Sequence, residues 1–161
     1  MVARTPMTTQ GYRNLQEELA RLKGEERMKI VRAIEEARAH GDLSENAEYD
    51  AAKNAQGLLE GRIRDLEAKL ATAQVVDVSS LSGEKVMFGA TVRLSDLDSG
   101  EERVVTLVGE DETNVEKGLL SFSSPLGKAL IGKKVDDIAK VRLPSGEKEY
   151  EILEVSFSAI S

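Results

Sequence analysis

Apolar residues in the first half of the chain recur at alternating steps of three and four, the spacing that is typical of helices packed as a coiled coil. The segment Gly24-Glu25-Glu26-Arg27 interrupts the first series. We therefore expect one helix, locally irregular, over about residues 10–40, with Thr8 or Thr9 as its cap and Gly41 as its end. The members of this first series are Tyr12, Leu15, Leu19, Leu22, Ile30, Ile34 and Ala37.

A second series of apolar positions is more regular and begins after a short break. Its members are Ala52, Gln56, Leu59, Ile63, Leu66, Leu70 and Ala73. Extending its steps backwards reaches Tyr49 and then Glu45. Neither series can bury its apolar stripe alone, and a short link places two helices antiparallel, so we expect a helical hairpin. At about 30 residues for each helix, the hairpin is a rod of roughly 45 Å.

The pattern changes after residue 77, where β-branched residues and turn residues predict a second domain built from short strands. Within it, Ser124 as N-cap, Pro125 in the first turn and Gly132 after the last turn predict one short helix. The expected class is therefore α+β, with an antiparallel coiled-coil hairpin over residues 1–77 and a small antiparallel sheet domain over residues 78–161. Strands are expected at 86–88, 91–94, 103–108, 119–122, 141–143 and 150–157, with turns at 98–100 and 144–146.

The link between the two helices is unusually acidic. Asp42 and Glu45 lie three residues apart, and Glu48 and Asp50 follow closely. One interpretation is a capping box, in which Asp42 caps the second helix and Glu45 reaches back to the cap. That interpretation needs only one or two of these acids. The other is a role in holding a divalent cation such as Mg²⁺, which prefers oxygen ligands. Two carboxylates do not complete its coordination, so a second macromolecule would have to supply the remaining ligands.

Two basic residues, Arg38 and Lys53, flank the acidic link, one near the end of each helix. The simpler interpretation is solvated surface charge. The functional interpretation is a small cationic patch that contacts a phosphate backbone close to the acids. His40, the only histidine, is expected at the helix C-terminus, where it interacts with the helix dipole.

Composition and charge exclude several classes of protein. A formal net charge of −7 argues against tight binding to bare nucleic acid through phosphate neutralisation. The chain has no cysteine, which excludes disulfides, thiolate metal sites and cysteine nucleophiles. It also lacks an apolar signal core and a stretch near the ~18 apolar residues of a membrane span. We expect a soluble, cytoplasmic protein with no membrane partner.

Five segments carry a resemblance to a known family, namely residues 41–49, 51–53, 60–63, 88–92 and 124–132. They resemble the Gre family of bacterial transcription elongation and transcript cleavage factors. The resemblance extends over almost the whole chain, and residues 41–49, the tip signature, are highly specific. The resemblance is closer to the GreA branch than to the GreB branch, whose hairpin carries a larger basic patch.

The resemblance implies an FKBP-like second domain that docks on RNA polymerase, at the rim of the secondary channel in its largest subunit. The hairpin would enter that channel and bring its tip to the nascent RNA 3′ end. The family's two essential tip acids correspond to Asp42 and Glu45, which would help the polymerase hold a second Mg²⁺ and position the attacking water. Its basic tip residues correspond to Arg38 and Lys53. Its polymerase contact corresponds to Ser124, Pro125 and Leu126.

The resemblance further implies that the chain is not itself an enzyme, but stimulates the polymerase's own cleavage of backtracked RNA and rescues arrested complexes. The free protein is expected to be a monomer that holds no cofactor stably, with Mg²⁺ shared only in the complex. Three alternatives stay open. They are an FKBP-like prolyl isomerase or chaperone with a coiled-coil arm, which needs an aromatic-lined cleft, a Gre-like transcription inhibitor, and a structural adaptor. The pattern of Asp42 and Glu45 favours stimulation over inhibition.

Overall fold

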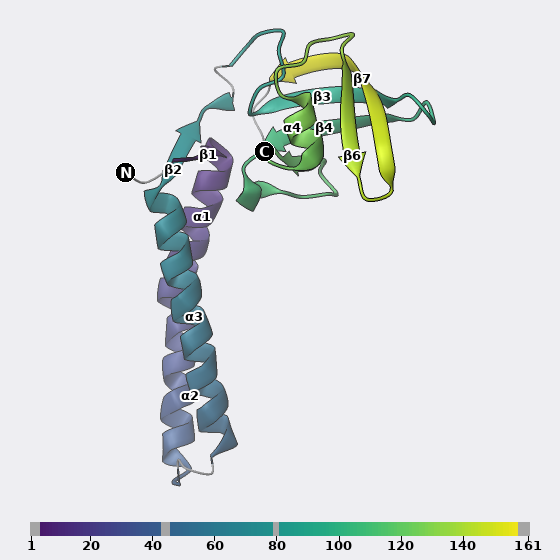
Figure 1. Cartoon of the computed structure of the whole chain (residues 1–161). Coiled ribbons are helices and arrows are strands. Elements are labelled where there is room, and N and C mark those ends of the chain that lie inside the picture. Colours follow the sequence, from purple (N-terminus) through teal and green to yellow (C-terminus); the bar gives the residue numbers. More distant parts are fainter. Residues whose placement is uncertain (1–3, 43–45, 79–80, 158–161) are drawn as a thin grey trace. The chain divides into compact units, whose positions relative to one another are not determined.

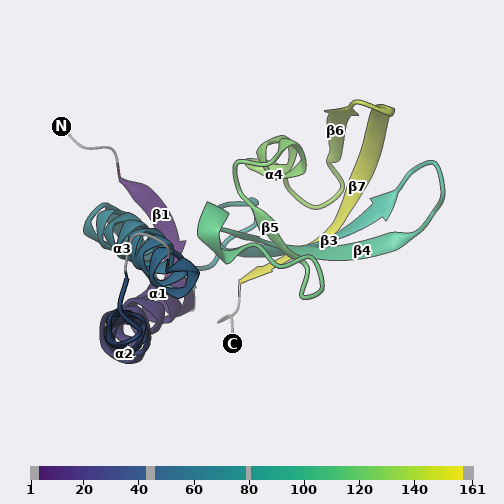
Figure 2. The ribbon, with the colours of Figure 1, turned by 90° about the horizontal axis from the view of Figure 1, so that it is seen from below.

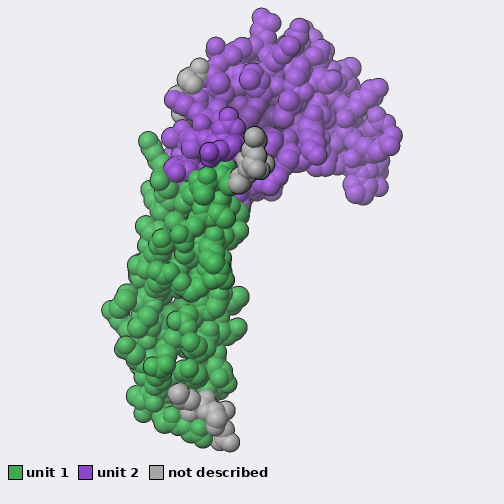
Figure 3. Space-filling view, turned by 60° about the vertical axis from the view of Figure 1, so that its left-hand side comes forward, with its two compact units in different colours: residues 1–2, 13–72 green, residues 3–12, 73–161 purple. Residues whose placement is uncertain are grey.

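The computed structural model of the chain describes residues 4–42, 46–78 and 81–157. Its residues divide into two compact units, which Figure 3 colours separately. The hairpin unit contains Arg13–Thr72. The sheet unit contains Ala3–Tyr12 together with Ala73–Ser161, so it takes in residues from near the N-terminus as well as the second half of the chain.

The first apolar series forms one irregular helical arm, as the sequence predicts (Figure 1). The arm consists of α1 (Thr9–Arg21), a π-helical turn η1 (Leu22–Glu26) and α2 (Arg27–Ala39). The irregular turn falls on the segment that interrupts the apolar spacing. The expectation of a single, locally irregular helix is therefore confirmed.

Both ends of this arm also agree with the sequence. Thr8 is the cap, because its hydroxyl accepts a hydrogen bond from the Gly11 N–H at 3.0 Å. His40 is the C-cap of α2. Gly41 follows with φ +102°, a conformation that glycine adopts at little cost, and it ends the arm.

The π-helical turn explains why the apolar spacing breaks where it does. A π-helical turn takes in one more residue than an α-helical turn. Counting from Leu22, that extra residue moves the next seam position from Glu26 to Arg27, and Ile30 then falls on the seam again. Arg27 donates two hydrogen bonds to the carboxylate of Glu60 on the opposite helix, at 2.9 and 2.6 Å. A polar pair thus replaces one apolar layer, and the coiled-coil seam continues beyond it.

The second apolar series forms α3 (Ala47–Ala71), which runs antiparallel beside α2 (Figures 1 and 2). Its buried residues Ala52, Ile63 and Leu66 are all members of the predicted seam. Leu58, which lies outside the seam, is 71% exposed. The prediction of a helical hairpin is therefore confirmed.

The last residue assigned to the second seam, Ala73, lies beyond the helix. It begins β2 (Ala73–Val76), which pairs in parallel with β1 (Thr5–Thr8). Neither strand is predicted from the sequence. Each has only four residues, and neither shows the alternation of buried and exposed positions on which strand prediction depends.

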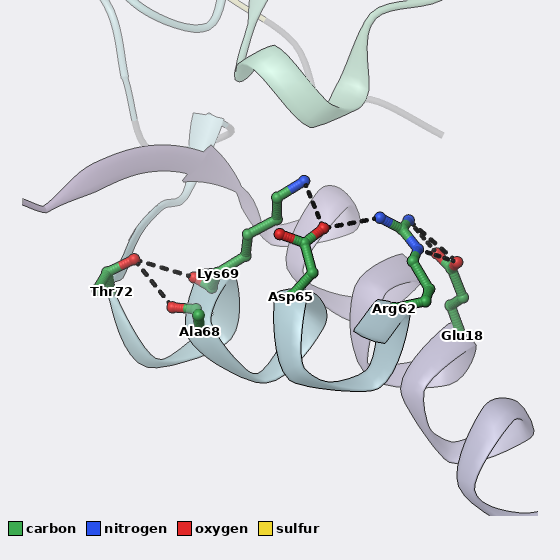
Figure 4. Close-up of polar contacts among 6 residues, drawn as sticks. All are labelled: Glu18, Arg62, Asp65, Ala68, Lys69 and Thr72. Atoms are coloured by element: carbon green, nitrogen blue, oxygen red, sulfur yellow. Dashed lines mark hydrogen bonds and ion pairs between the residues drawn. The ribbon is translucent and has the colours of Figure 1, made fainter. Parts of the chain in front are cut away.

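Charged side chains join the two helices in the part of the hairpin nearest to β2 (Figure 4). Arg62 on α3 pairs with Glu18 on α1 at 3.0 Å, and also with Asp65 one turn further along α3 at 3.1 Å. Lys69 extends the network by pairing with the same Asp65 at 3.3 Å. Arg62, Asp65 and Lys69 thus alternate in charge along α3, and Glu18 joins them from α1.

The five strands of the sheet unit lie in the order β5-β4-β3-β7-β6, and the sheet is curled (Figures 1 and 2). All neighbouring pairs are antiparallel except β4 and β5, so the expectation of a wholly antiparallel sheet is wrong at that pair. The chain reaches β5 through the 3₁₀ turn η4 (Glu110–Glu112), not through a tight hairpin. The α+β class itself is confirmed. The strands are β3 (Ala90–Asp96), β4 (Glu102–Val108), β5 (Leu119–Ser121), β6 (Ile138–Leu143) and β7 (Gly146–Phe157).

The predicted short helix is α4 (Pro125–Leu130), and it packs on β6. The strand predicted at residues 86–88 is wrong, because Val86 lies in a loop. Its N–H donates to the Lys133 carbonyl, and its carbonyl accepts from the Gly132 N–H, both at 2.8 Å. Its apolar side chain is fully buried in the core of the sheet unit, which accounts for the misleading strand-like composition.

Within the sheet unit, Glu112 binds the residues that precede α1. Its carboxylate accepts hydrogen bonds from the Thr8 N–H at 3.1 Å, from the Thr8 hydroxyl and from the Gly109 N–H at 2.9 Å. Gly11 faces the same carboxylate so closely that a Cβ atom would overlap it. The capping hydroxyl of Thr8 is therefore itself held in place from the second half of the chain.

Candidate functional site at the hairpin tip

The tip of the hairpin lies between the end of α2 and the start of α3. The N-cap of α3 is Asn46, whose side-chain oxygen accepts a hydrogen bond from the Tyr49 N–H at 3.1 Å. Its side-chain nitrogen donates to the carbonyl of Ala37, in the last turn of α2, at 2.6 Å. One amide group therefore connects the last turn of α2 to the first turn of α3.

This assignment corrects the capping-box interpretation of the link. That interpretation made Asp42 the N-cap, whereas the structure starts α3 four residues later, with Asn46 as its cap. Asp42 is exposed. Glu45 lies outside the described residues. The sequence did contain a signal for Asn46, since asparagine is among the strongest N-cap residues and Tyr49, to which the apolar series extends back, lies three residues after it.

An open depression of about 420 Å³ lies at the tip, and Asp42 and Asn46 are among its lining residues. His40 and Glu48 also line it, and His40 Nδ1 lies 3.2 Å from Glu48 Oε2. Among the described residues, no group of three or more histidine, aspartate or glutamate side chains is placed to hold a metal ion. The oxygen chemistry of Asp42 suits Mg²⁺. Any such ion would need ligands from outside the described part of the chain.

The two basic residues predicted near the acids lie on different helices. Arg38 is in the last turn of α2 and is exposed. Lys53 lies on α3, is exposed, and donates a hydrogen bond from Nζ to Gln56 Oε1 at 3.0 Å. Both are therefore accessible to a phosphate group, and they come from opposite sides of the link along the chain.

The segment Ser124–Leu126 belongs to the sheet unit. Ser124 caps α4, accepting a hydrogen bond from the Gly127 N–H at 3.0 Å, and Pro125 occupies its first turn. Leu126 is only 8% exposed and packs in the core. Leu126 therefore anchors the segment in the core. Ser123, the residue before the segment, donates a hydrogen bond to Glu110 Oε1 at 2.8 Å.

Two family models match this chain in succession. The first, described as transcription elongation factor, N-terminal, matches residues 5–75, and the second, transcription elongation factor, GreA/GreB, C-term, matches residues 81–157. The chain belongs to the GreA/GreB family of transcription elongation factors. The resemblance to the Gre family that the sequence segments predict is thereby confirmed.

Individual relatives agree with this family assignment. Transcription elongation factor GreA of Trichlorobacter lovleyi is 58% identical over 152 residues, covering 94% of this chain and 96% of that protein. Transcription elongation factor GreA of Beijerinckia indica is also 58% identical over 152 residues, covering 94% of this chain and 97% of that protein. The crystal structure of GreA factor homolog 1 (Gfh1) of Thermus thermophilus is 30% identical and covers 95% of this chain and 99% of that one, with a TM-score of 0.43. Because that score is low, the GreA/GreB assignment rests on the sequence matches.

Two further observations bear on what this GreA/GreB family member can do. An isomerase would use aromatic side chains to line a cleft. Here Phe88 and Phe122 pack edge to face on one another, with ring centroids 5.6 Å apart, and Tyr150 is buried in the core. Among the described helices, none is both long and apolar enough to cross a membrane.

Proposed function

We propose that this chain binds RNA polymerase and stimulates the polymerase's own cleavage of backtracked RNA, without being a nuclease itself. The observation that carries this proposal is an exposed carboxylate, Asp42, at the far end of a two-helix rod in a member of the GreA/GreB family. A rod with an exposed acid at its end suits delivery of that acid into a confined site on another molecule. The nascent RNA 3′ end, extruded into the secondary channel of the polymerase, is the proposed target.

The tip would act by supplying oxygen ligands. Asp42, together with Glu45, would complete the coordination of a Mg²⁺ ion that the polymerase holds weakly. When bound, a second metal ion in a phosphodiester cleavage site activates the attacking water and stabilises the leaving oxygen. The chain's own contribution is to orient these carboxylates and to accept a hydrogen bond from the water. The free chain is expected to bind Mg²⁺ only weakly.

The remaining site residues are assigned to binding and orientation. Arg38 and Lys53 would contact RNA phosphates on either side of the acids, and Lys53 would exchange its hydrogen bond to Gln56 for a phosphate oxygen. Ser124 and Pro125, at the start of α4, would contact the polymerase. Leu126 would hold that segment in shape from the core.

The test is to add the purified chain to backtracked polymerase complexes with Mg²⁺ and to follow RNA shortening. The wild-type chain should shorten the RNA, and Asp42→Asn with Glu45→Gln should lower the rate by about 10²-fold or more, the scale for losing a transition-state charge stabiliser. Asp50→Asn is the control, because it removes one neighbouring negative charge from an exposed position on the first turn of α3 and should leave the rate unchanged. Competition with labelled wild-type chain should show unchanged polymerase binding for all variants. Full cleavage by the double variant would overturn the proposal.

A further inference from the structure

The side chain of Asn46 does more than cap a helix. Capping requires only an acceptor, and the Asn46 oxygen provides it to the Tyr49 N–H at 3.1 Å. The amide nitrogen makes a second, shorter hydrogen bond of 2.6 Å to the carbonyl of Ala37 on the other helix. A serine or aspartate cap would provide the first bond and lack the amide N–H for the second.

The partner of that second bond is fixed by the hairpin seam. Ala37 is fully buried between the helices. Its carbonyl is one of the last four of α2, which have no partner within an α-helix, and it also accepts from the His40 N–H at 3.2 Å. The Asn46 bond therefore ties the start of α3 to a rigid point of α2, and Asn46 itself is half-buried.

A second contact spans the same two helix ends but is weaker in character. His40 Nδ1 and Glu48 Oε2 lie 3.2 Å apart, and their side chains are 60% and 70% exposed. Pairs this exposed contribute little, because water screens them. The neutral, half-buried Asn46 bond is therefore the better candidate for holding the end of α2 against the start of α3.

We propose that Asn46 is a positioning residue for the cleavage reaction, an inference that rests on the proposed function. By joining the two helix ends that flank the link, it restricts the positions that the Asp42 carboxylate can take. A catalytic group that is held in place reacts far more effectively than one that must be ordered during the reaction. The Asn46 bond thus acts on the rate of cleavage and not on the attachment of the chain to the polymerase.

The decisive variant is Asn46→Ser, which keeps a good helix cap and removes the amide N–H. At saturating concentrations of the chain, it should cleave backtracked RNA at least about 10-fold more slowly than wild type, the scale expected when a reacting group loses its fixed position. Its half-saturating concentration and its thermal unfolding midpoint should stay unchanged. Asn54→Ser is the matched control, since it makes the same change at an exposed position of α3, and it should leave the rate unaltered. A wild-type maximal rate for Asn46→Ser would overturn the inference.

Hydrogen exchange on the free chain provides a readout that does not depend on cleavage. Asn46→Ser should speed backbone exchange of His40 and Gly41, whose N–H groups bond to the last turn of α2, whereas Asn54→Ser should not. Unchanged exchange in Asn46→Ser would overturn the role of the bond whether or not cleavage is stimulated. A wild-type chain that fails to shorten RNA, with exchange behaving as expected, would instead overturn the proposed function.

Discussion

The two halves of the hairpin are built differently. The base segment, Arg13–Arg27 against Leu59–Ala71, buries large side chains such as Leu22, Ile63 and Leu66. The tip segment, Met28–Ala39 against Ala47–Leu58, instead buries one large side chain, Ile34, and two alanines, Ala37 and Ala52.

Charged contacts sharpen this difference. In the base segment, the ion pairs Glu18–Arg62, Lys23–Glu67 and Arg27–Glu60 each join one helix to the other. At the far end of the tip segment, the neutral bond of Asn46 joins the helices instead. Buried apolar area provides most of the stability of a helical hairpin. We infer that the base segment makes the rod stable, and that the slender tip segment depends on one well-placed hydrogen bond for its geometry.

The π-helical turn lies at the end of the base segment, next to the tip segment, and offers the strongest test of the comparison. One alanine inserted after Gly24 should rotate everything beyond it by about 100° around the helix axis. Ile34 and Ala37 would then leave the seam. The free energy of unfolding should fall by more than it does for a single Ile→Ala change in a core, which costs about 2–5 kcal/mol. Chemical denaturation followed by far-UV circular dichroism measures it.

Deletion of Gly24 is the matched control for this insertion. It removes the extra residue of η1, so Arg27 would follow Leu22 after four residues and the apolar spacing would become regular. Stability should then change by less than about 1 kcal/mol, since Gly24 is exposed and a Cβ there would meet no neighbouring atom. If deletion and insertion prove equally damaging, the explanation of the π-helical turn as one accommodated residue is wrong.

Much of the hairpin could be predicted because its determinants are local and periodic. The seam of α3 follows directly from its apolar spacing. The interruption of the spacing at residues 24–27 predicted the irregular turn that the structure shows as η1. The capping-box interpretation placed the start of α3 wrongly, because Asp42 and Asn46 are both good N-caps. Only the contact of Asn46 with Ala37, nine residues away, distinguishes them, and that contact requires the folded hairpin.

The sheet unit was harder to predict because its errors arise from long-range pairing. The cap of α4 at Ser124 was predictable from adjacent residues. The parallel pairing of β4 with β5 depends on how the chain returns through η4, which no local pattern records. Val86 was mistaken for a strand residue because burial in a loop and burial in a sheet demand the same apolar side chain.

The packing of the base segment can be weakened by one substitution. Leu66 is fully buried, and Leu66→Ala should lower the free energy of unfolding by about 2–5 kcal/mol. The exposed Leu58 serves as the control, and Leu58→Ala should change stability by less than about 0.5 kcal/mol. Equal effects of the two substitutions, measured by urea unfolding, would contradict the assignment of the seam.

The tip segment should instead gain stability when its seam is filled. Gln56 occupies a seam position but is polar, half-buried and bonded to Lys53. Gln56→Leu should add apolar contact and stabilise the hairpin by about 1 kcal/mol, as expected for partial burial of a leucine side chain. Hydrogen exchange should then slow in Ala47–Leu58 more than in Leu59–Ala71. A uniform change along α3 would show that the two segments do not differ in local stability.

The smallest expected effect concerns the polar layer at the boundary of the two segments. The hydrogen bond from Arg27 holds the pKa of Glu60 below its ordinary value of 4.5. Glu60 therefore stabilises the folded chain above about pH 4.5, where it is ionised in both states, and this contribution disappears as the pH falls through its lower folded pKa. The unfolding midpoint of Glu60→Gln should lie below that of wild type at neutral pH, and the difference should vanish in acid. In an Arg27→Gln background, Glu60→Gln should lose most of this pH dependence, because the hydrogen bond that is the main cause of the lowered pKa of Glu60 is gone and only the charge of Arg64 still lowers it. If the pH dependence of Glu60→Gln survives in full without Arg27, then the hydrogen bond from Arg27 is not the main cause of the lowered pKa of Glu60.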